Sequence, residues 1–165
     1  MSKDTALALE EKVGRLLVQR GLTLALAESC TGGLIGHRIT DVPGSSDYFI
    51  GSVVAYAYQV KERVLGVRHE TLCEHGAVSE QVALEMARGA GRLLASDVAL
   101  AVTGVAGPGG GTPEKPVGLV YVALSAHDAE RCQQHVWPFD RAGNKAASAD
   151  AALTLLLEYL EGRLQ

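Results

Sequence analysis

Two short apolar runs in this chain each lead directly into a segment dense in polar residues and glycine. Leu22–Leu26 is followed by Glu28–Gly33, and Val98–Val102 is followed by Thr103–Gly111, the most glycine-dense part of the sequence. Continuous apolar runs of this length are typical of strands buried on both faces of a parallel sheet. Ligands of such sheets bind at the carboxyl ends of the strands, so we expect both polar segments at one edge.

The rest of the chain alternates between helical and strand patterns. Apolar spacing predicts helices over Thr5–Gln19, Leu34–Ile39, Lys61–Leu65, 80–94 after an N-cap at Ser79, and Ala142–Leu160, with one turn starting at Thr71. Further strands are expected within Tyr48–Tyr58 and over Val117–Leu124 and Arg131–Trp137, the last two forming an antiparallel hairpin. This order predicts an α/β fold, a three-layer α/β/α sandwich with a mixed, mostly parallel sheet containing one antiparallel strand. A length of 165 residues predicts a single domain over residues 1–165.

Charge and composition exclude several classes of protein. A net charge of -4 provides no basic face for nucleic acid, and no apolar run approaches the ~18 residues of a membrane span. The first residues lack the pattern of a secretory signal, and three widely spaced cysteines predict no disulfide framework, so we expect a cytoplasmic protein. The five histidines show no metal-ligand spacing, which predicts neither a metal nor another cofactor.

Ser29 is the first candidate for chemistry, because it lies between a buried strand and a helix start. Free backbone N–H groups at such a place can bind an oxyanion, and a serine there can attack a carbonyl once a base removes its proton. A helix-capping serine fits the same position. The neighbouring Cys30 could compete as a thiolate nucleophile, although a lone cysteine among small residues is usually part of a core.

Lys61 is the candidate base, since no motif places a histidine near Ser29. A lysine removes a proton from serine only if burial or a neighbouring cation lowers its pKa, and a solvated surface lysine is the alternative. Tyr56 and Tyr58 are expected to share one face of the preceding strand by alternation, where one could bond to the lysine or simply pack.

The glycine segment Thr103–Gly111 allows close backbone approach and could bind a phosphate through its N–H groups. It is not a P-loop, because no Gly-Lys-Ser/Thr follows, and a flexible loop remains an equal alternative. Arg141 could reach the same anion or pair with Asp140 at the surface.

Five motifs occur together in the order and spacing of one family: Ala27–Gly33, Pro43–Ser46, Gly76–Glu80, Thr103–Gly110 and Lys115–Gly118. Over about residues 5–160 the chain resembles the C-terminal domain of the competence/damage-inducible protein CinA, in its stand-alone form. The resemblance implies a three-layer α/β/α fold and an amidohydrolase of pyridine nucleotide salvage. That enzyme converts nicotinamide mononucleotide and water to nicotinic acid mononucleotide and ammonia.

The resemblance also implies roles for individual residues. It makes Ser29 the nucleophile and Lys61 its base, with Tyr56 beside them. The substrate-binding residues that it implies are Glu28, Thr31, Gly32, Gly33, Ser46, Thr103, Gly104, Ala106, Gly107 and Arg141. Because domains of this size often build sites near subunit contacts, we also expect a homo-oligomer.

The chain departs from the family pattern at two places. Tyr58 stands where the family often has asparagine, and Asn144-Lys145 replaces Val-Arg beside a Phe139–Arg141 segment that lacks the usual glycine. A lysine keeps the charge but loses the bidentate geometry of arginine. Two alternatives therefore stay open: a non-catalytic nucleotide-binding or regulatory module, and a hydrolase of another small amide.

Overall fold

The computed structural model describes residues 7–164. Within them the chain forms five strands: β1 (Leu24–Glu28), β2 (Phe49–Val54), β3 (Val98–Gly104), β4 (Leu119–Ala126) and β5 (Glu130–Val136). Its helices are α1 (Leu9–Arg20), α2 (Leu34–Thr40), the 3₁₀ turn η1 (Ser45–Asp47), α3 (Tyr58–Leu65), α4 (His69–His75), α5 (Glu80–Leu94) and α6 (Arg141–Leu160). None of the helices in this range is long and apolar enough to cross a membrane.

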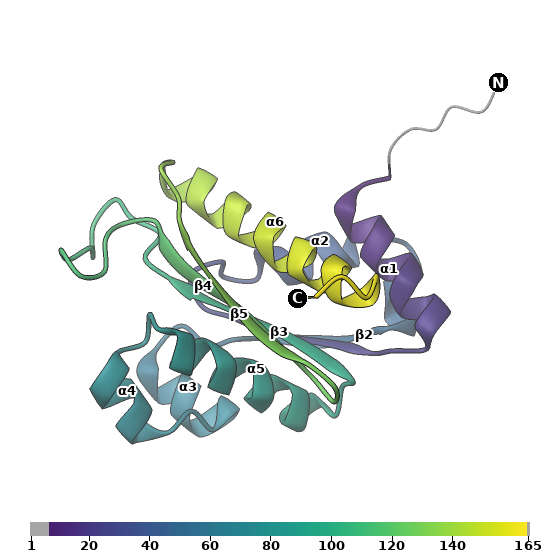
Figure 1. Cartoon of the computed structure of the whole chain (residues 1–165), viewed down its shortest axis with the longest axis horizontal. Coiled ribbons are helices and arrows are strands. Elements are labelled where there is room, and N and C mark those ends of the chain that lie inside the picture. The colour runs from purple at the N-terminus through teal and green to yellow at the C-terminus, as the bar shows by residue number, and fades with distance from the viewer. Residues whose placement is uncertain (1–6, 165) are drawn as a thin grey trace.

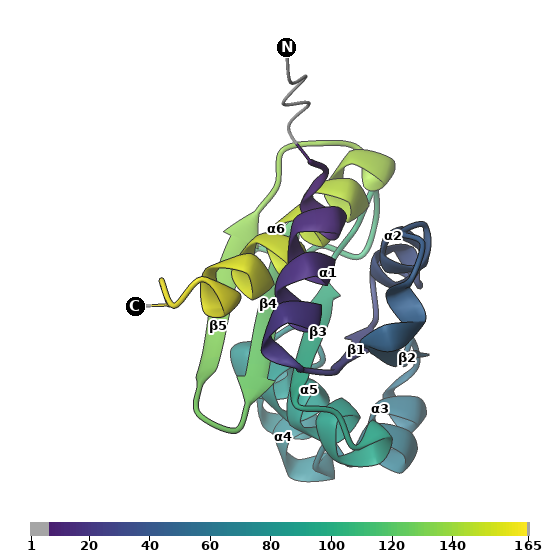
Figure 2. The ribbon, with the colours of Figure 1, turned by 90° about the vertical axis from the view of Figure 1, so that its right-hand side faces the viewer.

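The strands form one sheet in the order β2-β1-β3-β4-β5, which Figure 2 shows from its right-hand end to its left. Strands β2, β1 and β3 are parallel, and β4 runs against both β3 and β5. The predicted mixed sheet with one reversed strand is therefore confirmed. The hairpin is also confirmed, because the N–H of Ala126 donates to the carbonyl of Ala129 across its turn.

Helices cover both faces of the sheet and complete the predicted three layers (Figure 1). On the face covered by α1, α2 and α6, the central strands present large aliphatic side chains: Leu24, Leu26, Val98, Leu100, Val102, Val120, Val122 and Leu124. On the face covered by α3, α4 and α5, the same strands present Ala25, Ala27, Ala99, Ala101 and Ala123. This alanine face lets α5 lie close to the sheet, because at these positions the strands contribute only methyl groups and the larger buried side chains, Val82 and Met86, come from the helix.

Helix α5 also packs tightly against the end of α3. A side-chain carbon on Gly89 would overlap the carbonyl oxygen of Leu65, the last residue of α3. Gly66 follows in a left-handed conformation and ends α3, as its position in the sequence predicts. The small residues of α5 therefore determine where α3 lies, which matters below because α3 carries Lys61.

Several predicted boundaries are wrong by two to four residues. Strand β1 extends to Glu28 rather than ending at Leu26, because Glu28 still pairs with Val102 and Val54 in the ladders. Helix α3 begins at Tyr58 rather than Lys61, and α4 begins two residues before Thr71 without a side-chain cap. The helix predicted from Thr5 begins at Leu9, and its first two residues lie outside the described range.

The close contact at Gly89 yields a stability prediction. We expect Gly89→Ala to lower the free energy of unfolding by about 2 kcal/mol or more, since backbone must move to admit the methyl group. Gly91→Ala on the same helix is the matched control, because its methyl group would lie 3.6 Å from Ala99, an ordinary contact. Urea denaturation of both variants measures the difference, and equal stabilities would contradict this account of how α5 positions α3.

Candidate active site

Ser29 is held at the carboxyl end of the central strands. It directly follows β1, and its backbone N–H donates to the carbonyl of Val102 in β3 at 2.9 Å. The residue is 8% exposed. Since the glycine segment also leaves β3 here, the two polar segments do lie at the same edge of the sheet, as predicted.

The side chain of Lys61 reaches Ser29 from inside the protein. Its Nζ lies 2.9 Å from Ser29 Oγ, 2.7 Å from the carbonyl oxygen of Ala55 and 3.1 Å from that of Tyr56. Lys61 is only 1% exposed, which makes it one of the largest fully buried side chains. Of the ion pairs among residues 7–164, none involves this amine.

Burial without a carboxylate partner lowers the pKa of Lys61 to about 8. The neutral amine is therefore accessible near neutral pH. A neutral amine has two N–H bonds and one lone pair, and Lys61 faces two carbonyl oxygens and one hydroxyl group. The carbonyls can accept the two N–H bonds, which leaves the lone pair for the proton of Ser29. This arrangement can remove a proton from serine.

Burial shifts the pKa of the neighbouring Cys30 in the opposite direction. Its side chain is 6% exposed and packs in the aliphatic cluster between the sheet and α6. Burial raises the pKa of its thiol to about 11, so at neutral pH it stays protonated. Because the thiolate is the reactive form, Ser29 rather than Cys30 has the setting of a nucleophile.

The turn after Ser29 offers unpaired backbone donors. Gly32 and Gly33 adopt φ values of 60° and 99°, which favour glycine. The N–H of Gly32 donates to the Ser29 carbonyl, whereas those of Cys30, Thr31 and Gly33 have no acceptor among the described residues. Such donors beside a nucleophile can stabilise an oxyanion.

Glu28 is placed differently from the expectation that it contacts substrate. The residue is 0% exposed. Its Oε1 accepts from the hydroxyl of Thr31 and the N–H of Ile35, and its Oε2 accepts from the N–H of Gly36 and the hydroxyl of Ser52. With both oxygens occupied inside the protein, Glu28 has no means of touching a ligand.

Two further expected substrate contacts do not reach the site. Thr103 is 1% exposed, and its hydroxyl donates to the carbonyl of Ala77, so it ties β3 to the segment before α5. Ser46 lies in η1, just before the amino end of β2, whereas Ser29 follows the carboxyl end of β1. A six-residue strand spans about 20 Å, so within one chain these serines lie at opposite edges of the sheet.

The predicted arrangement of Tyr56 and Tyr58 is also wrong, because β2 ends at Val54. Tyr56 lies in the following loop, where its carbonyl binds Lys61 and its hydroxyl accepts from Arg141 Nη2 at 3.3 Å. Tyr58 starts α3, and its hydroxyl accepts from the N–H of Ala77. The lysine therefore contacts the backbone of this segment and neither tyrosine hydroxyl.

Arg141 fastens the glycine segment to α6. Its Nη1 donates to the carbonyl of Gly107 at 2.7 Å, and the neighbouring Asn144 donates to the carbonyl of Ala106 at 3.0 Å. Gly104 is needed where β3 meets β4, since a side-chain carbon there would lie 2.6 Å from Val120. The start of the glycine segment is thus fixed to α6 by these two hydrogen bonds to its carbonyl groups, and is not a free loop.

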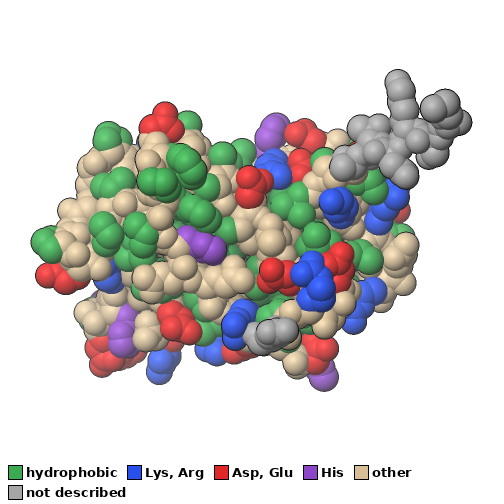
Figure 3. Space-filling view, turned by 45° about the horizontal axis from the view of Figure 1, so that its top comes forward, with side chains coloured by type: hydrophobic (Ala, Val, Ile, Leu, Met, Phe, Trp, Pro, Cys, Tyr) green, Lys and Arg blue, Asp and Glu red, His purple; other side chains and the backbone are tan. Residues whose placement is uncertain are grey.

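A pocket of about 950 Å³ adjoins this clasp. Its lining combines two cations with apolar side chains: Leu34, Ala106, Pro108, Val117, Phe139, Asp140, Arg141, Ala142, Lys145 and Ala146. In the space-filling view, hydrophobic side chains gather at this end of the molecule, over the start of α6 and the loop before β4 (Figure 3). The hydroxyl of Ser29 is not part of the lining.

Lys145 connects the pocket with the serine turn. Its amine lies 3.8 Å from the position that a side-chain carbon would take on Gly32, and it also lines the pocket. In the sequence, Lys145 stands out only as a departure from the family pattern. The sequence does contain a signal that Lys145 lies near Arg141, because the two residues are four apart and so share one face of α6.

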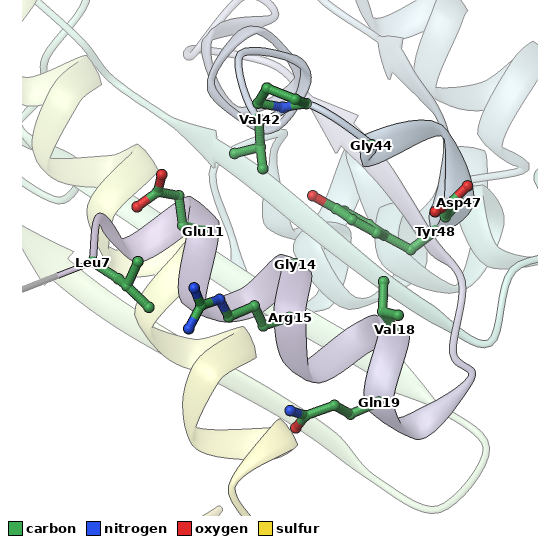
Figure 4. A pocket seen from close by; sticks show the side chains of 11 residues that line it. Leu7, Glu11, Gly14, Arg15, Val18, Gln19, Val42, Gly44, Asp47 and Tyr48 are labelled. Carbon is green, nitrogen blue, oxygen red and sulfur yellow. The ribbon is translucent and has the colours of Figure 1, made fainter.

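A second pocket, of about 610 Å³, lies between α1 and the segment 42–48 and holds none of the expected site residues (Figure 4). Tyr48 reaches across it to the backbone of Gly14. Within residues 7–164, no three His, Cys, Asp or Glu side chains are grouped as metal ligands would be.

Comparison with known proteins agrees with this fold. A family model described as the CinA C-terminal domain matches residues 6–160. A "putative competence-damage inducible protein" of Desulforamulus reducens is 49% identical over 155 residues, 94% of this chain and 38% of that protein. A "CinA-like protein" of Desulforapulum autotrophicum is 52% identical over 151 residues, 91% of this chain and 36% of that protein. The chain thus spans just over a third of these relatives.

Solved structures match over nearly their whole length. A competence/damage inducible protein from Agrobacterium tumefaciens superposes with a TM-score of 0.87 at 40% identity, covering 93% of this chain and 95% of that one. A competence damage-inducible protein A from Klebsiella pneumoniae gives 0.90 at 35% identity, covering 93% and 95%. With the family model spanning almost every described residue, the chain belongs to the CinA C-terminal domain family.

Proposed function

We propose that this chain hydrolyses the carboxamide of nicotinamide mononucleotide to nicotinic acid mononucleotide and ammonia. The observation that carries the proposal is the buried contact between Lys61 Nζ and Ser29 Oγ, made without a carboxylate near the amine. The reaction class rests on this contact and on the unpaired N–H groups of the turn. The choice of substrate rests on the resemblance of the motifs, since the relatives' names state no activity.

The first half of the reaction forms an acyl-enzyme. Neutral Lys61 takes the proton of Ser29 as the serine oxygen attacks the carboxamide carbon. The carbonyl oxygen becomes an anion, which the N–H groups of Cys30, Thr31 and Gly33 are available to stabilise. Protonated Lys61 then gives its proton to the leaving nitrogen, the C–N bond breaks, and ammonia departs.

The second half repeats these roles with water. Lys61, again neutral, accepts a proton from the water that attacks the acyl carbon. The tetrahedral intermediate collapses, the C–O bond to Ser29 breaks, and the proton returns from Lys61 to the serine oxygen. The acid is released and the enzyme regains its starting state, so each cycle consumes one water.

The pocket beside the turn supports a nucleotide as substrate. Arg141 and Lys145 can bind a phosphate, and the arginine is already oriented by Gly107 and Tyr56. Leu34, with the other apolar residues of the lining, can pack against a flat ring. A phosphate bound by these cations lies on the side of the turn where Lys145 meets Gly32.

The nucleophile is tested by comparing two neighbouring residues. We expect Ser29→Ala to lower kcat at least ~10³-fold, because the attacking oxygen is lost. Cys30→Ala should keep most of the activity, since its thiol only packs. Ammonia release from nicotinamide mononucleotide measures both, and circular dichroism checks the fold. An active serine variant beside an inactive cysteine variant would overturn the assignment.

The same assay separates the proposed activity from its alternatives. Ammonia release from nicotinamide mononucleotide alone, and not from nicotinamide or glutamine, is the expected result. Release from another of these amides would indicate a different hydrolase. No release from any of them would favour a binding module of the same fold.

The pKa of Lys61 yields a pH prediction. Because the base must be neutral, kcat/KM should rise with pH along a single limb with a midpoint near 8 and then reach a plateau. Below that midpoint the amine is protonated and activity is lost. Lys61→Arg should be inactive over the whole range, since a guanidinium stays charged. A limb near 6.5, where histidine titrates, would contradict a lysine base.

The phosphate site is tested by removing charge. We expect Lys145→Gln and Arg141→Gln each to raise KM for the nucleotide about tenfold or more, the loss of one charged hydrogen bond. For the riboside, which lacks the phosphate, KM should change little in either variant. Equal effects on nucleotide and riboside would show that these cations act on something other than the phosphate.

A further inference from the structure

We propose that Glu28 is a positioning residue, whose buried carboxylate fixes the turn Ser29–Gly33 so that its unpaired N–H groups are preorganised for an oxyanion. This inference rests on the proposed function, because it concerns how the same serine works. It gives Glu28 a role that does not require contact with substrate.

The contacts of Glu28 enclose the serine turn. Its backbone ends β1 and directly precedes Ser29, while its side chain reaches forward to Thr31 at 2.8 Å and to the N–H groups of Ile35 and Gly36 at 2.9 and 3.1 Å. The carboxylate therefore holds both the turn and the first turn of α2. A shift of the turn relative to β1 would stretch the bond from Thr31.

A fourth contact fixes this unit to the neighbouring strand. Ser52 of β2 donates to Glu28 Oε2 at 2.9 Å. The serine turn, α2 and β2 therefore all bind this one carboxylate. Among the ion pairs of residues 7–164, none involves Glu28.

The donors at the carboxylate define a sharp substitution. Each oxygen accepts from one backbone N–H, of Ile35 or Gly36, and a backbone N–H can only donate. In Glu28→Gln, the amide NH₂ must face one of these N–H groups whichever way it is turned. The variant keeps the volume of the side chain but brings two hydrogen-bond donors face to face. We expect this to loosen the turn without leaving a cavity.

The experiment compares Glu28→Gln with Glu85→Gln. Glu85 also binds a backbone N–H and a hydroxyl, those of Arg68 and Thr71, but it lies on α5 away from the serine. We expect Glu28→Gln to lower kcat about 100-fold, the usual effect of an ångström-scale misplacement, with KM within about threefold of wild type. The midpoint of the pH limb should stay in place, and Glu85→Gln should keep wild-type kcat.

An aryl boronic acid supplies a readout that a merely structural role would not change. Its boron forms an anionic tetrahedral adduct with a serine oxygen, so its affinity reports the oxyanion site. Affinity for 3-pyridineboronic acid should fall about as much as kcat in Glu28→Gln, while affinity for nicotinic acid mononucleotide stays within about threefold. If Glu28→Gln does not fold, Thr31→Val becomes the deciding variant, because it removes the hydroxyl that donates to Glu28. We expect both its kcat and its boronate affinity to fall about tenfold.

The outcomes separate this inference from the proposed function. Wild-type activity together with unchanged kcat and boronate affinity in the deciding variant overturns the role of Glu28 and leaves the serine–lysine mechanism standing. A rise in KM with unchanged kcat overturns it in the same way. If the wild type releases no ammonia, the proposed function fails, and the boronate comparison alone then decides whether Glu28 organises the turn.

Discussion

The site depends on the burial of one amine without a neighbouring negative charge. Lowering the pKa of Lys61 from 10.5 to about 8 corresponds to about 3 kcal/mol in favour of the neutral amine. A carboxylate beside Nζ would reverse this effect and leave a permanent cation. The protein instead offers the uncharged oxygens of Ala55, Tyr56 and Ser29. It places its buried carboxylate, Glu28, on the other side of the serine turn, where backbone N–H groups bind it.

The layered packing brings this amine to the serine. The alanine face of the sheet allows α5 to lie close, and Gly89 lets α3 pack against α5 in turn. Lys61 extends from α3 to the carboxyl end of β1, so its position depends on how α3 packs against α5. The helices on the opposite face hold the other half of the site, because α6 clasps the glycine segment through Arg141 and Asn144.

The sequence predicts the fold and the Ser29–Lys61 pair better than the environment of each polar side chain. Strand and turn patterns are local, so a mixed, mostly parallel sheet can be predicted from them. Whether Glu28 or Thr103 faces a ligand depends on partners such as Ser52 and Ala77, which are distant along the chain. For Ser46, a motif shared with a family does not tell at which end of the strands the residue lies. The proximity of Lys145 to Arg141, by contrast, follows from their four-residue spacing on one helix, which is a local signal.

The alanine face also bears on how this scaffold can diversify. The alanines on this face of the sheet are at most 1% exposed, so a larger side chain there would push α5 away from the sheet and, with it, α3 and Lys61. The residues around the pocket stand outside that layer, and several of them, Pro108, Phe139 and Ala146 among them, are exposed. Substitutions there can reshape the ligand site without disturbing the base. We therefore expect new substrate preferences to evolve by exchange of these rim residues, with the interior left constant.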